Sequence, residues 1–351
     1  GADEAAAIQA ALDSGNPILI SEKTFRITST IAVPSNAYLF GLGANSIIYI
    51  DTNITAMELV GSFSVMRDFK ILGTKAGNGT VGLSQIGIYV KGGFTDTWTD
   101  NNVSNIIFDT LYFGSYHDYN VLTRRGAFNA FGLTANNCIT GYIFKGSAEY
   151  SCFTGCNAYK CTIGVDMNGG NNSWVGGNIC DNTTGFKLTG GGNDGHCVMT
   201  GTKLNHNGTT LNASGVLKGY HITSCMMYSG YVVIFGSTQI TISDCEISSQ
   251  SFLISNTTKS KLNNCTFVSN PLSGFHAITN SPDFEFNGCT FYAGSIPVNW
   301  VNYVRVKISS AAGIPSDTPT LTSGMIPMQV DTTNNRLYLY VNGAWKYVSL
   351  T

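Results

Sequence analysis

A short phrase recurs in the C-terminal half of the chain, and its spacing restricts the fold more than any other feature. The phrase centres on Cys225, Cys245, Cys265 and Cys289, at intervals of 245 − 225 = 20, 265 − 245 = 20 and 289 − 265 = 24 residues. Each copy has an apolar residue three positions before the cysteine. Periods of about 20–50 residues are typical of stacked repeat architectures. Such an array leaves outward strand faces, loops and chain interfaces for function.

A second phrase precedes the first in each repeat and follows the pattern apolar, any residue, apolar. Its glycine-led copies start at Gly87, Gly141, Gly164, Gly185 and Gly215. Alternation along a strand predicts that its apolar side chains point inward. These inward residues are Tyr142, Phe144, Val165, Met167, Phe186 and Leu188. Ile143, Asp166 and Lys187 would then point outward, one above another on successive turns.

The cysteine phrase needs a bend, because Ile242 and Cys245 are three residues apart and we expect both to face inward. Ser243-Asp244 supplies the bend, and Asn263-Asn264 and Asn287-Gly288 supply it in later copies. Asn and Gly tolerate the left-handed backbone that a sharp bend requires. Each turn of the chain, here called a rung, therefore has at least three short strands. We predict an all-β fold, a right-handed parallel β-helix with rungs about 4.8 Å apart.

The ends and two side loops interrupt this pattern. A helix is expected from Asp3 to Leu12, where apolar residues four apart lie among alanines, and Asn342-Gly343 predicts a hairpin. Two polar and aromatic stretches, Lys91–Asn105 and Gly114–Phe128, are expected to be loops between rungs. The expected divisions are an N-terminal cap with the helix (1–20), a β-helix (21–308), a linker (309–324) and a small C-terminal β module (325–351).

Composition excludes several classes of function. Only 11% of the residues are charged and the net charge is −2, so no basic surface for a nucleic-acid partner is expected. No apolar stretch approaches the roughly 20 residues of a membrane span. No phosphate-binding loop or metal-ligand cluster is evident, and we expect no cofactor and no metal.

The ten cysteines are expected to be structural. Cys138 and the four repeated cysteines occupy what looks like one slot beside apolar residues, where free Cys behaves as a small hydrophobe. Cys152, Cys156 and Cys161 do not have a recognised zinc spacing. Free thiols indicate assembly in a reducing compartment, although some disulfide pairing stays open.

Three features together resemble bacteriophage tailspike proteins, whose fold is similar to the pectate lyase superfamily. They are the start ADEAAAIQAALDSG followed by PILISEKTFRITSTI, the ladder with Asn and Cys at its corner, and the ending DTTNNRLYLYVNGAWKYV. The resemblance implies a homotrimer in the virion tail, assembled in the host cytoplasm, that binds and often cleaves a bacterial surface polysaccharide. The abrupt start at Gly1 leads us to expect an upstream region that joins other tail or baseplate proteins.

Hydrolysis of a glycosidic bond uses two carboxyl groups, about 5–5.5 Å apart for retention or about 6.5–9.5 Å apart for inversion. Outward residues one rung apart would be separated by about 4.8 Å and two rungs apart by about 9.6 Å, so the scaffold can supply either geometry. The predicted catalytic residues are Asp166, Asp194 and Glu149, of which Asp166 is the best placed. A solvated surface ion pair between Asp166 and Lys187 is the plainer alternative.

Six further residues are predicted to bind the saccharide, namely Lys187, His196, Trp98, Arg124, Arg125 and His117. Asp194 and His196 lie in a Gly-rich insertion, residues 190–197, which could also be an ordinary turn. Arginine can hold a sugar carboxylate through two hydrogen bonds. The loop with His117 and the two arginines could instead pack against a neighbouring chain.

Three functions remain open from the sequence. The first is a tailspike that binds and cleaves capsule or lipopolysaccharide O-antigen, as a glycoside hydrolase rather than a lyase, because the Asp clusters of calcium-dependent lyases have no clear counterpart. The second is a non-catalytic receptor-binding or structural spike on the same scaffold. The third is a secreted pectin-degrading enzyme, which the C-terminal module disfavours.

Overall fold

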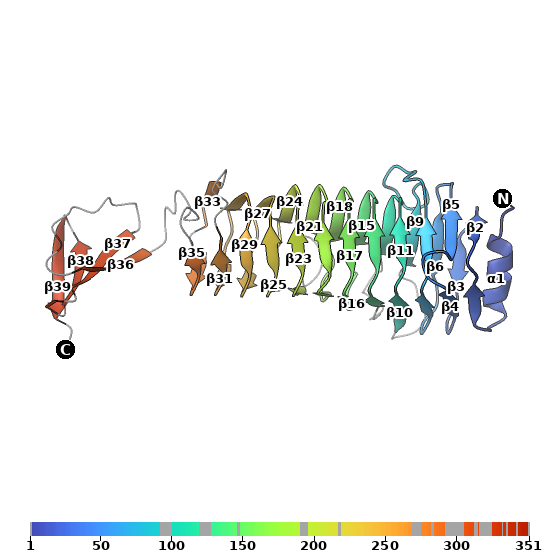
Figure 1. Ribbon diagram of the computed structural model, residues 1–351, viewed down its shortest axis with the longest axis horizontal. Helices are drawn as coiled ribbons and strands as arrows, with labels where there is room; N and C mark the ends of the chain where they lie inside the picture. Colours follow the sequence, from blue (N-terminus) through green and yellow to red (C-terminus); the bar gives the residue numbers. More distant parts are fainter. Residues whose placement is uncertain are drawn as a thin grey trace.

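The computed structural model describes residues 2–91, 100–118, 128–145, 148–189, 196–216, 219–268, 275–281, 284–291, 305–311, 315, 325–331, 333–334, 336–341 and 343–349. Helix α1 (Ala5–Asp13) comes first, and short strands follow in a coil of three-stranded rungs (Figure 1). Each strand of the coil pairs in parallel with the equivalent strand of the next rung, so three long sheets run along the coil. The predicted parallel β-helix is confirmed.

The three sheets take every third strand of the coil. Sheet A comprises β1 (Ile18–Ile20), β4 (Tyr38–Gly41), β7 (Val65–Arg67), β10 (Asn101–Ser104), β13 (Phe128–Phe131), β16 (Ser151–Thr154), β19 (Ser173–Val175), β22 (Val198–Thr200), β25 (Tyr220–Thr223), β28 (Ile240–Ser243), β31 (Lys261–Asn263) and β34 (Glu285–Asn287). Sheet B comprises β2 (Thr24–Ile27), β5 (Ile47–Ile50), β8 (Lys70–Leu72), β11 (Ile107–Asp109), β14 (Thr134–Asn136), β17 (Asn157–Tyr159), β20 (Asn178–Cys180), β23 (Lys203–Asn205), β26 (Met226–Tyr228), β29 (Glu246–Ser248), β32 (Thr266–Phe267) and β35 (Thr290–Phe291). Sheet C comprises β3 (Ile31–Val33), β6 (Thr55–Leu59), β9 (Ile86–Lys91), β12 (Phe113–Asp118), β15 (Thr140–Phe144), β18 (Ile163–Met167), β21 (Thr184–Thr189), β24 (Thr209–Ser214), β27 (Tyr231–Phe235), β30 (Ser251–Ser255) and β33 (Phe275–Thr279).

The core fills the inside of the coil, because alternate side chains of every strand point inward. In the middle rungs it is aromatic: the rings of Phe153 and Trp174 stack with centroids 5.3 Å apart and planes 6° apart. The inward positions predicted for sheet C are confirmed, since each is at most 2% exposed. These positions are Tyr142, Phe144, Val165, Met167, Phe186 and Leu188.

Many corners between sheets A and B have a residue with positive φ followed by an inward side chain, which is a cysteine at Cys156, Cys225, Cys245 and Cys265. The predicted bends are confirmed, with φ of 53° at Asp244, 51° at Asn264 and 64° at Gly288. The following residue turns inward, and its thiol donates to the carbonyl two residues earlier; for Cys245 this contact to Ser243 O is 3.1 Å. The thiol is a second donor to Ser243 O, because this carbonyl also accepts from Ser224 N at 3.0 Å.

One cysteine was assigned to the wrong corner. Cys138 follows β14 and lies between sheets B and C, whereas Cys156 follows β16 and takes the slot between sheets A and B. Both corners use the same local geometry, with φ of 56° at Asn137 and 64° at Gly155. The two corners therefore produce the same sequence phrase, and the sequence alone could not distinguish them.

A column of glycines lies near the start of the sheet C strand on five successive rungs. A Cβ atom added to Gly164 would lie 2.6 Å from Gly185 O and 2.9 Å from Ile179 Cγ2. The other members have similar restrictions, because each backbone approaches the next carbonyl too closely for a side chain. The column consists of Gly87, Gly114, Gly141, Gly164 and Gly185.

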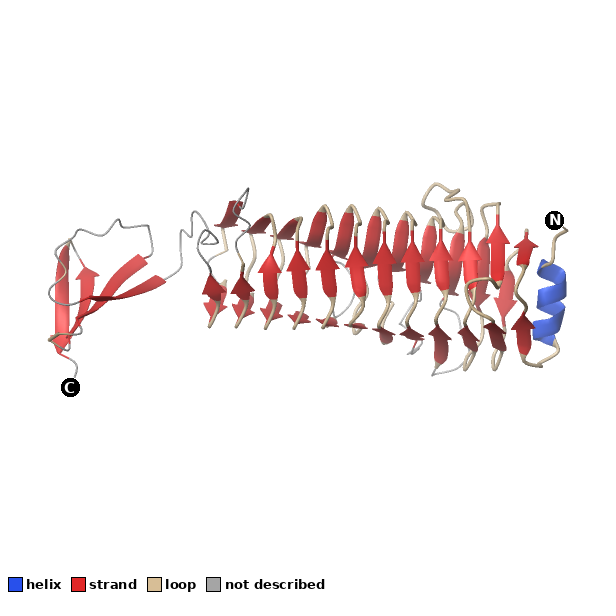
Figure 2. Ribbon diagram, viewed as in Figure 1, coloured by secondary structure: helices blue, strands red, loops and turns tan. Residues whose placement is uncertain are grey.

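Helix α1 covers the first rung (Figure 2), where the coil would otherwise expose its core and an unpaired strand edge. Ile8 and Leu12 are buried on the helix face that meets the core. Gln9 pairs with the backbone of β3 at both ends of its amide: Nε2 donates to Ala32 O at 2.9 Å, and Oε1 accepts from Ala32 N at 2.8 Å. The helix thus completes the hydrogen bonds of the edge strand.

Two predicted loops are shorter than expected. The stretch Lys91–Asn105 includes strand β10, and the stretch Gly114–Phe128 begins with most of strand β12. Polar residues suggested loops there, but parallel pairing with neighbouring rungs supplies the backbone hydrogen bonds that a strand needs.

A separate four-stranded sheet ends the chain. It comprises β36 (Arg305–Ala311), β37 (Met325–Asp331), β38 (Arg336–Val341) and β39 (Ala344–Ser349). The predicted hairpin is present, since β38 and β39 pair antiparallel. Strand β36 spans the expected boundary at residue 308 and pairs in parallel with β37.

Candidate functional site

One outward column of sheet C crosses most rungs and carries the predicted site. Parallel register places its members one rung, about 4.8 Å, apart. In order they are Glu58, Tyr89, Tyr116, Ile143, Asp166, Lys187, Asn212, Val233 and Leu253. The predicted stacking of Ile143, Asp166 and Lys187 is confirmed, because each is the register partner of the next.

Asp166 and Lys187 form an ion pair across β18 and β21. Lys187 Nζ lies 3.1 Å from Asp166 Oδ2, and the side chains are 33% and 13% exposed respectively. Asp166 Oδ1 is buried and has no hydrogen-bond partner. The carboxylate therefore has one oxygen without a donor, while Lys187 balances its charge through the other oxygen.

The N-terminal half of this column is covered. Tyr89 and Tyr116 are only 8% and 6% exposed, and their rings meet edge to face at 5.5 Å. They belong to a small apolar cluster outside the coil that also contains Phe113 and Ile143. Burial and the nearby carboxylate of Asp118 raise the pKa of each tyrosine to about 12. These rings are therefore packed and are not open platforms for a sugar.

His117 lies inside the coil, contrary to its predicted role. Strand β12 turns it inward, where it is fully buried, and its ring stacks on Phe144 at 4.8 Å. Ser115 Oγ contacts its Nε2 at 2.7 Å. Burial lowers the pKa of His117 to about 3, so the ring is neutral. A saccharide outside the coil cannot contact this ring, and we remove His117 from the candidate site.

Two other predicted residues lie at the turn between sheets C and A. Glu149 is buried, 4% exposed, between β15 and β16. His196 is exposed just before β22, and its Cδ2 is near the backbone of Gly219 one rung on. Asp166 and Lys187 lie near the C-terminal ends of β18 and β21. The turns that lead from sheet C to sheet A leave from these same strand ends, so they lie beside the column. Asp194, Trp98, Arg124 and Arg125 lie outside the described residues.

The column does not hold the two carboxyl groups that hydrolysis needs. The residues one and two rungs from Asp166 at the same position are Ile143, Tyr116, Lys187 and Asn212, and none is an acid. A second carboxyl for the usual mechanism would have to come from the neighbouring turn or from another chain.

The cysteines take no part in this site. All ten are free thiols, and burial raises the pKa of Cys156 to about 12. The Cys156 thiol is therefore unreactive, because the thiolate is the nucleophile and the metal ligand, and no cysteine lies on a described strand of sheet C. In the part of the chain that the structure describes, no group of three or more His, Cys, Asp and Glu side chains could hold a metal ion.

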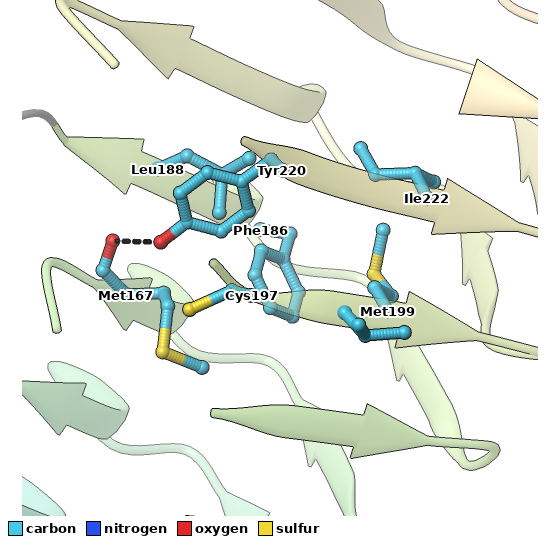
Figure 3. A pocket seen from close by; sticks show the side chains of 8 residues that line it. Met167, Phe186, Leu188, Cys197, Met199, Tyr220 and Ile222 are labelled. Atoms are coloured by element: carbon cyan, nitrogen blue, oxygen red, sulfur yellow. Dashed lines mark hydrogen bonds between the residues drawn. The ribbon is translucent and has the colours of Figure 1, made fainter. Parts of the chain in front are cut away.

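A small cavity of about 10 Å³ lies inside the coil rather than on its surface (Figure 3). Tyr220 hydroxyl donates to Met167 O at 3.4 Å beside it. The cavity has room for about one water and its walls are apolar, so it is a packing defect and not a saccharide site. Its walls are formed by Met167, Phe186, Leu188, Cys197, Val198, Met199, Tyr220 and Ile222.

The C-terminal continuation of the column has exposed aromatic residues on either side that are not among the residues predicted from the sequence. Strand β27 has Tyr231 and Phe235 on its outer face, 46% and 50% exposed. The alternating pattern around Val233 could have predicted these exposed rings. Val232 and Ile234 point inward, so the flanking aromatic residues point outward.

The fold is shared with proteins of known structure. The A-module of a mannuronan C-5 epimerase of Azotobacter vinelandii matches with a TM-score of 0.54 and 12% identity, over 83% of this chain and 96% of that chain. An α-1,3-glucanase catalytic unit of Streptomyces thermodiastaticus matches with 0.53 and 13%, over 84% and 68%. Tailspike protein 2 of an Escherichia coli O157:H7 bacteriophage matches with 0.47 and 15%, over 93% of this chain but 44% of that chain.

Protein-family models and curated protein sequences give no match. In the described residues no helix is long and apolar enough to cross a membrane. At these identities the structural likeness shows the fold alone, which this chain shares with the epimerase module and the glucanase unit.

Proposed function

We propose that the chain is a phage tail spike that binds a bacterial surface polysaccharide on the outer face of sheet C. The observation that carries this proposal is the Asp166–Lys187 ion pair, which stands in a column that is otherwise uncharged from Tyr89 to Leu253. A single paired charge beside amide and hydroxyl groups suits a ligand that is rich in hydroxyls.

Two further observations support this ligand class. Solved proteins with the same fold are named for action on mannuronan and on α-1,3-glucan, and others are named tailspikes. The sequence resemblance to tailspikes, carried by the start, the corner phrase and the ending of the chain, adds the phage context. The same proposal makes the chain a homotrimer of the virion tail, joined to other tail or baseplate proteins.

Cleavage of the polysaccharide is the second candidate function. It is favoured by Asp166 Oδ1, a buried carboxylate oxygen without a partner, and by the buried Glu149 at the neighbouring turn. It is disfavoured because no second acid lies in the column within two rungs of Asp166. Binding therefore fits the geometry better than hydrolysis.

Purified capsular polysaccharide and O-antigen preparations test both functions. Binding is measured by calorimetry, hydrolysis by new reducing ends and lyase action by the ultraviolet absorbance of unsaturated uronides. We expect binding by the wild type and weaker binding by Asp166→Asn. Asp181→Asn is the control, because Asp181 is an exposed corner residue with φ of 60°, a conformation that Asn tolerates.

The outcomes separate the two functions. Cleavage that Asp166→Asn abolishes would promote hydrolysis over simple binding, and binding without any product would leave the non-catalytic spike. If no preparation from any susceptible strain binds, the proposed function is wrong. Sedimentation of the wild-type chain tests the trimer separately.

A further inference from the structure

The outer face of β27 carries two exposed aromatic rings on one strand. Tyr231 and Phe235 are 46% and 50% exposed, with Val233 between them on the same face. Their Cα atoms are four residues apart, which is roughly 13 Å along a strand. This distance exceeds one sugar ring, so a ligand that touches both aromatic rings must contain several sugars.

The strands on either side complete an uncharged amphipathic surface. Register places Thr209, Asn212 and Ser214 of β24 beside the outward residues of β27. On the other side, Ser251, Leu253 and Ser255 of β30 are their partners. None of the three strands contains a charged residue. Apolar rings and aliphatic groups therefore alternate with hydroxyl and amide groups across the face.

This surface differs from the N-terminal part of the same sheet. There the outward tyrosines, Tyr89 and Tyr116, are at most 8% exposed and are packed in an apolar cluster. The open part of the face lies on the C-terminal side of Asp166, and Val233 is two rungs, roughly 9.6 Å, from Lys187. A ligand held at the ion pair would thus extend toward β27.

A pyranose ring has the complementary chemistry. Its C–H groups form an apolar face that can cover an aromatic ring, while its hydroxyl groups point to the rim and can bond to amides and hydroxyls. Aromatic side chains contribute a large apolar contact that has a defined geometry and little flexibility. A charged macromolecule would find no counter-charge on these three strands.

We propose that Tyr231 and Phe235 stack on uncharged sugar rings of an oligosaccharide that runs along β27, with β24 and β30 on its two sides. The inference rests on the proposed polysaccharide function and specifies which part of sheet C is used and by which kind of sugar. Asn212 and the hydroxyl groups of Thr209, Ser214 and Ser255 would accept and donate hydrogen bonds at the ring edges.

The test compares the double variant Tyr231→Ala/Phe235→Ala with Tyr38→Ala/Phe131→Ala. The control removes one Tyr and one Phe of matching exposure, 49% and 45%, from the outer face of sheet A. Binding of the capsular or O-antigen preparation that the wild type binds is measured by calorimetry. We expect affinity to fall about tenfold for each ring lost from β27, and to stay unchanged in the control.

The outcomes are distinct. If the wild type binds and the β27 variant binds equally well, the platform is wrong while the proposed function stands. If the wild type binds nothing, the proposed function fails and this inference fails with it. Sedimentation of both double variants measures their oligomeric state. If only the β27 variant changes its oligomeric state while its polysaccharide affinity is unchanged, this face contacts a second copy of the chain. The proposed stacking of Tyr231 and Phe235 on sugar rings is then wrong.

Discussion

A buried neutral histidine should make this β-helix sensitive to acid. His117 is fully buried among Phe144, Phe128 and Phe153, and burial lowers its pKa from 6.5 to about 3. In the unfolded chain the ring would titrate at its ordinary pKa. The free energy that the neutral ring contributes is therefore complete above about pH 6.5 and is lost as the pH falls toward about 3.

The size of the effect follows from this difference. Between those two pKa values the unfolded state binds one more proton, so the free energy of unfolding falls by about 1.4 kcal/mol per pH unit. From about pH 6.5 to about pH 4.5 the loss is about 3 kcal/mol. His117→Phe should remove this loss, although it leaves Ser115 Oγ without its ring partner and so lowers stability at all pH values.

Guanidinium unfolding followed by tryptophan fluorescence, at about pH 7.5 and about pH 4.5, measures the difference. The variant should lose about 3 kcal/mol less than the wild type between the two conditions. His221→Phe is the matched control, because His221 is exposed on β25, and it should keep the wild-type dependence. If His117→Phe shows the same loss as the wild type, the imidazole is not held neutral and the reasoning is refuted.

Two further predictions concern the cap and the corners. Gln9→Ala removes both hydrogen bonds to Ala32 and should lower the free energy of unfolding by about 1–3 kcal/mol. It should also promote end-to-end association, which light scattering would detect. Glu22 is exposed, and the control variant Glu22→Ala should show neither effect. Cys245→Ser should melt near the wild type, because the hydroxyl of Thr202 already donates to Gly176 O at 3.1 Å in the equivalent slot. Cys245→Asp should lower the free energy of unfolding by several kcal/mol. The loss should be larger at about pH 8 than at about pH 4, because burial raises the pKa of a carboxyl group. An unchanged melting temperature would mean that the slot faces solvent.

Much of the fold could be predicted because the signals are local and repeated. The alternation of apolar residues gave the inward positions of sheet C, such as Tyr142 and Val165. The odd spacing around Cys245 gave the corner, and the observed φ at Asp244 agrees with it. The glycine near the start of several sheet C strands was visible as a pattern, but its cause, the close approach of the next carbonyl, was not.

The candidate site was less predictable. The stacking of Asp166 and Lys187 followed from counting residues per rung. His117 was placed in a loop because its neighbours are polar, yet pairing of β12 with β9 and β15 makes the segment a strand and turns the ring inward. Polar neighbours in the sequence do not decide whether a side chain points inward or outward when a buried hydrogen-bond partner, such as Ser115 Oγ for His117, is available.

The sequence by itself determined the repeat, the parity of the strands and the bends, since these depend on neighbours a few residues apart. Only the tertiary structure decided which repeats share a corner, which parts of the outer column are covered and which are open. Tyr116 and Tyr231 both lie on the outer face of sheet C, but one is 6% exposed and the other 46%. Tyr116 packs in a cluster with Tyr89, Phe113 and Ile143, which come from three rungs, and no local sequence pattern could reveal this contact between rungs.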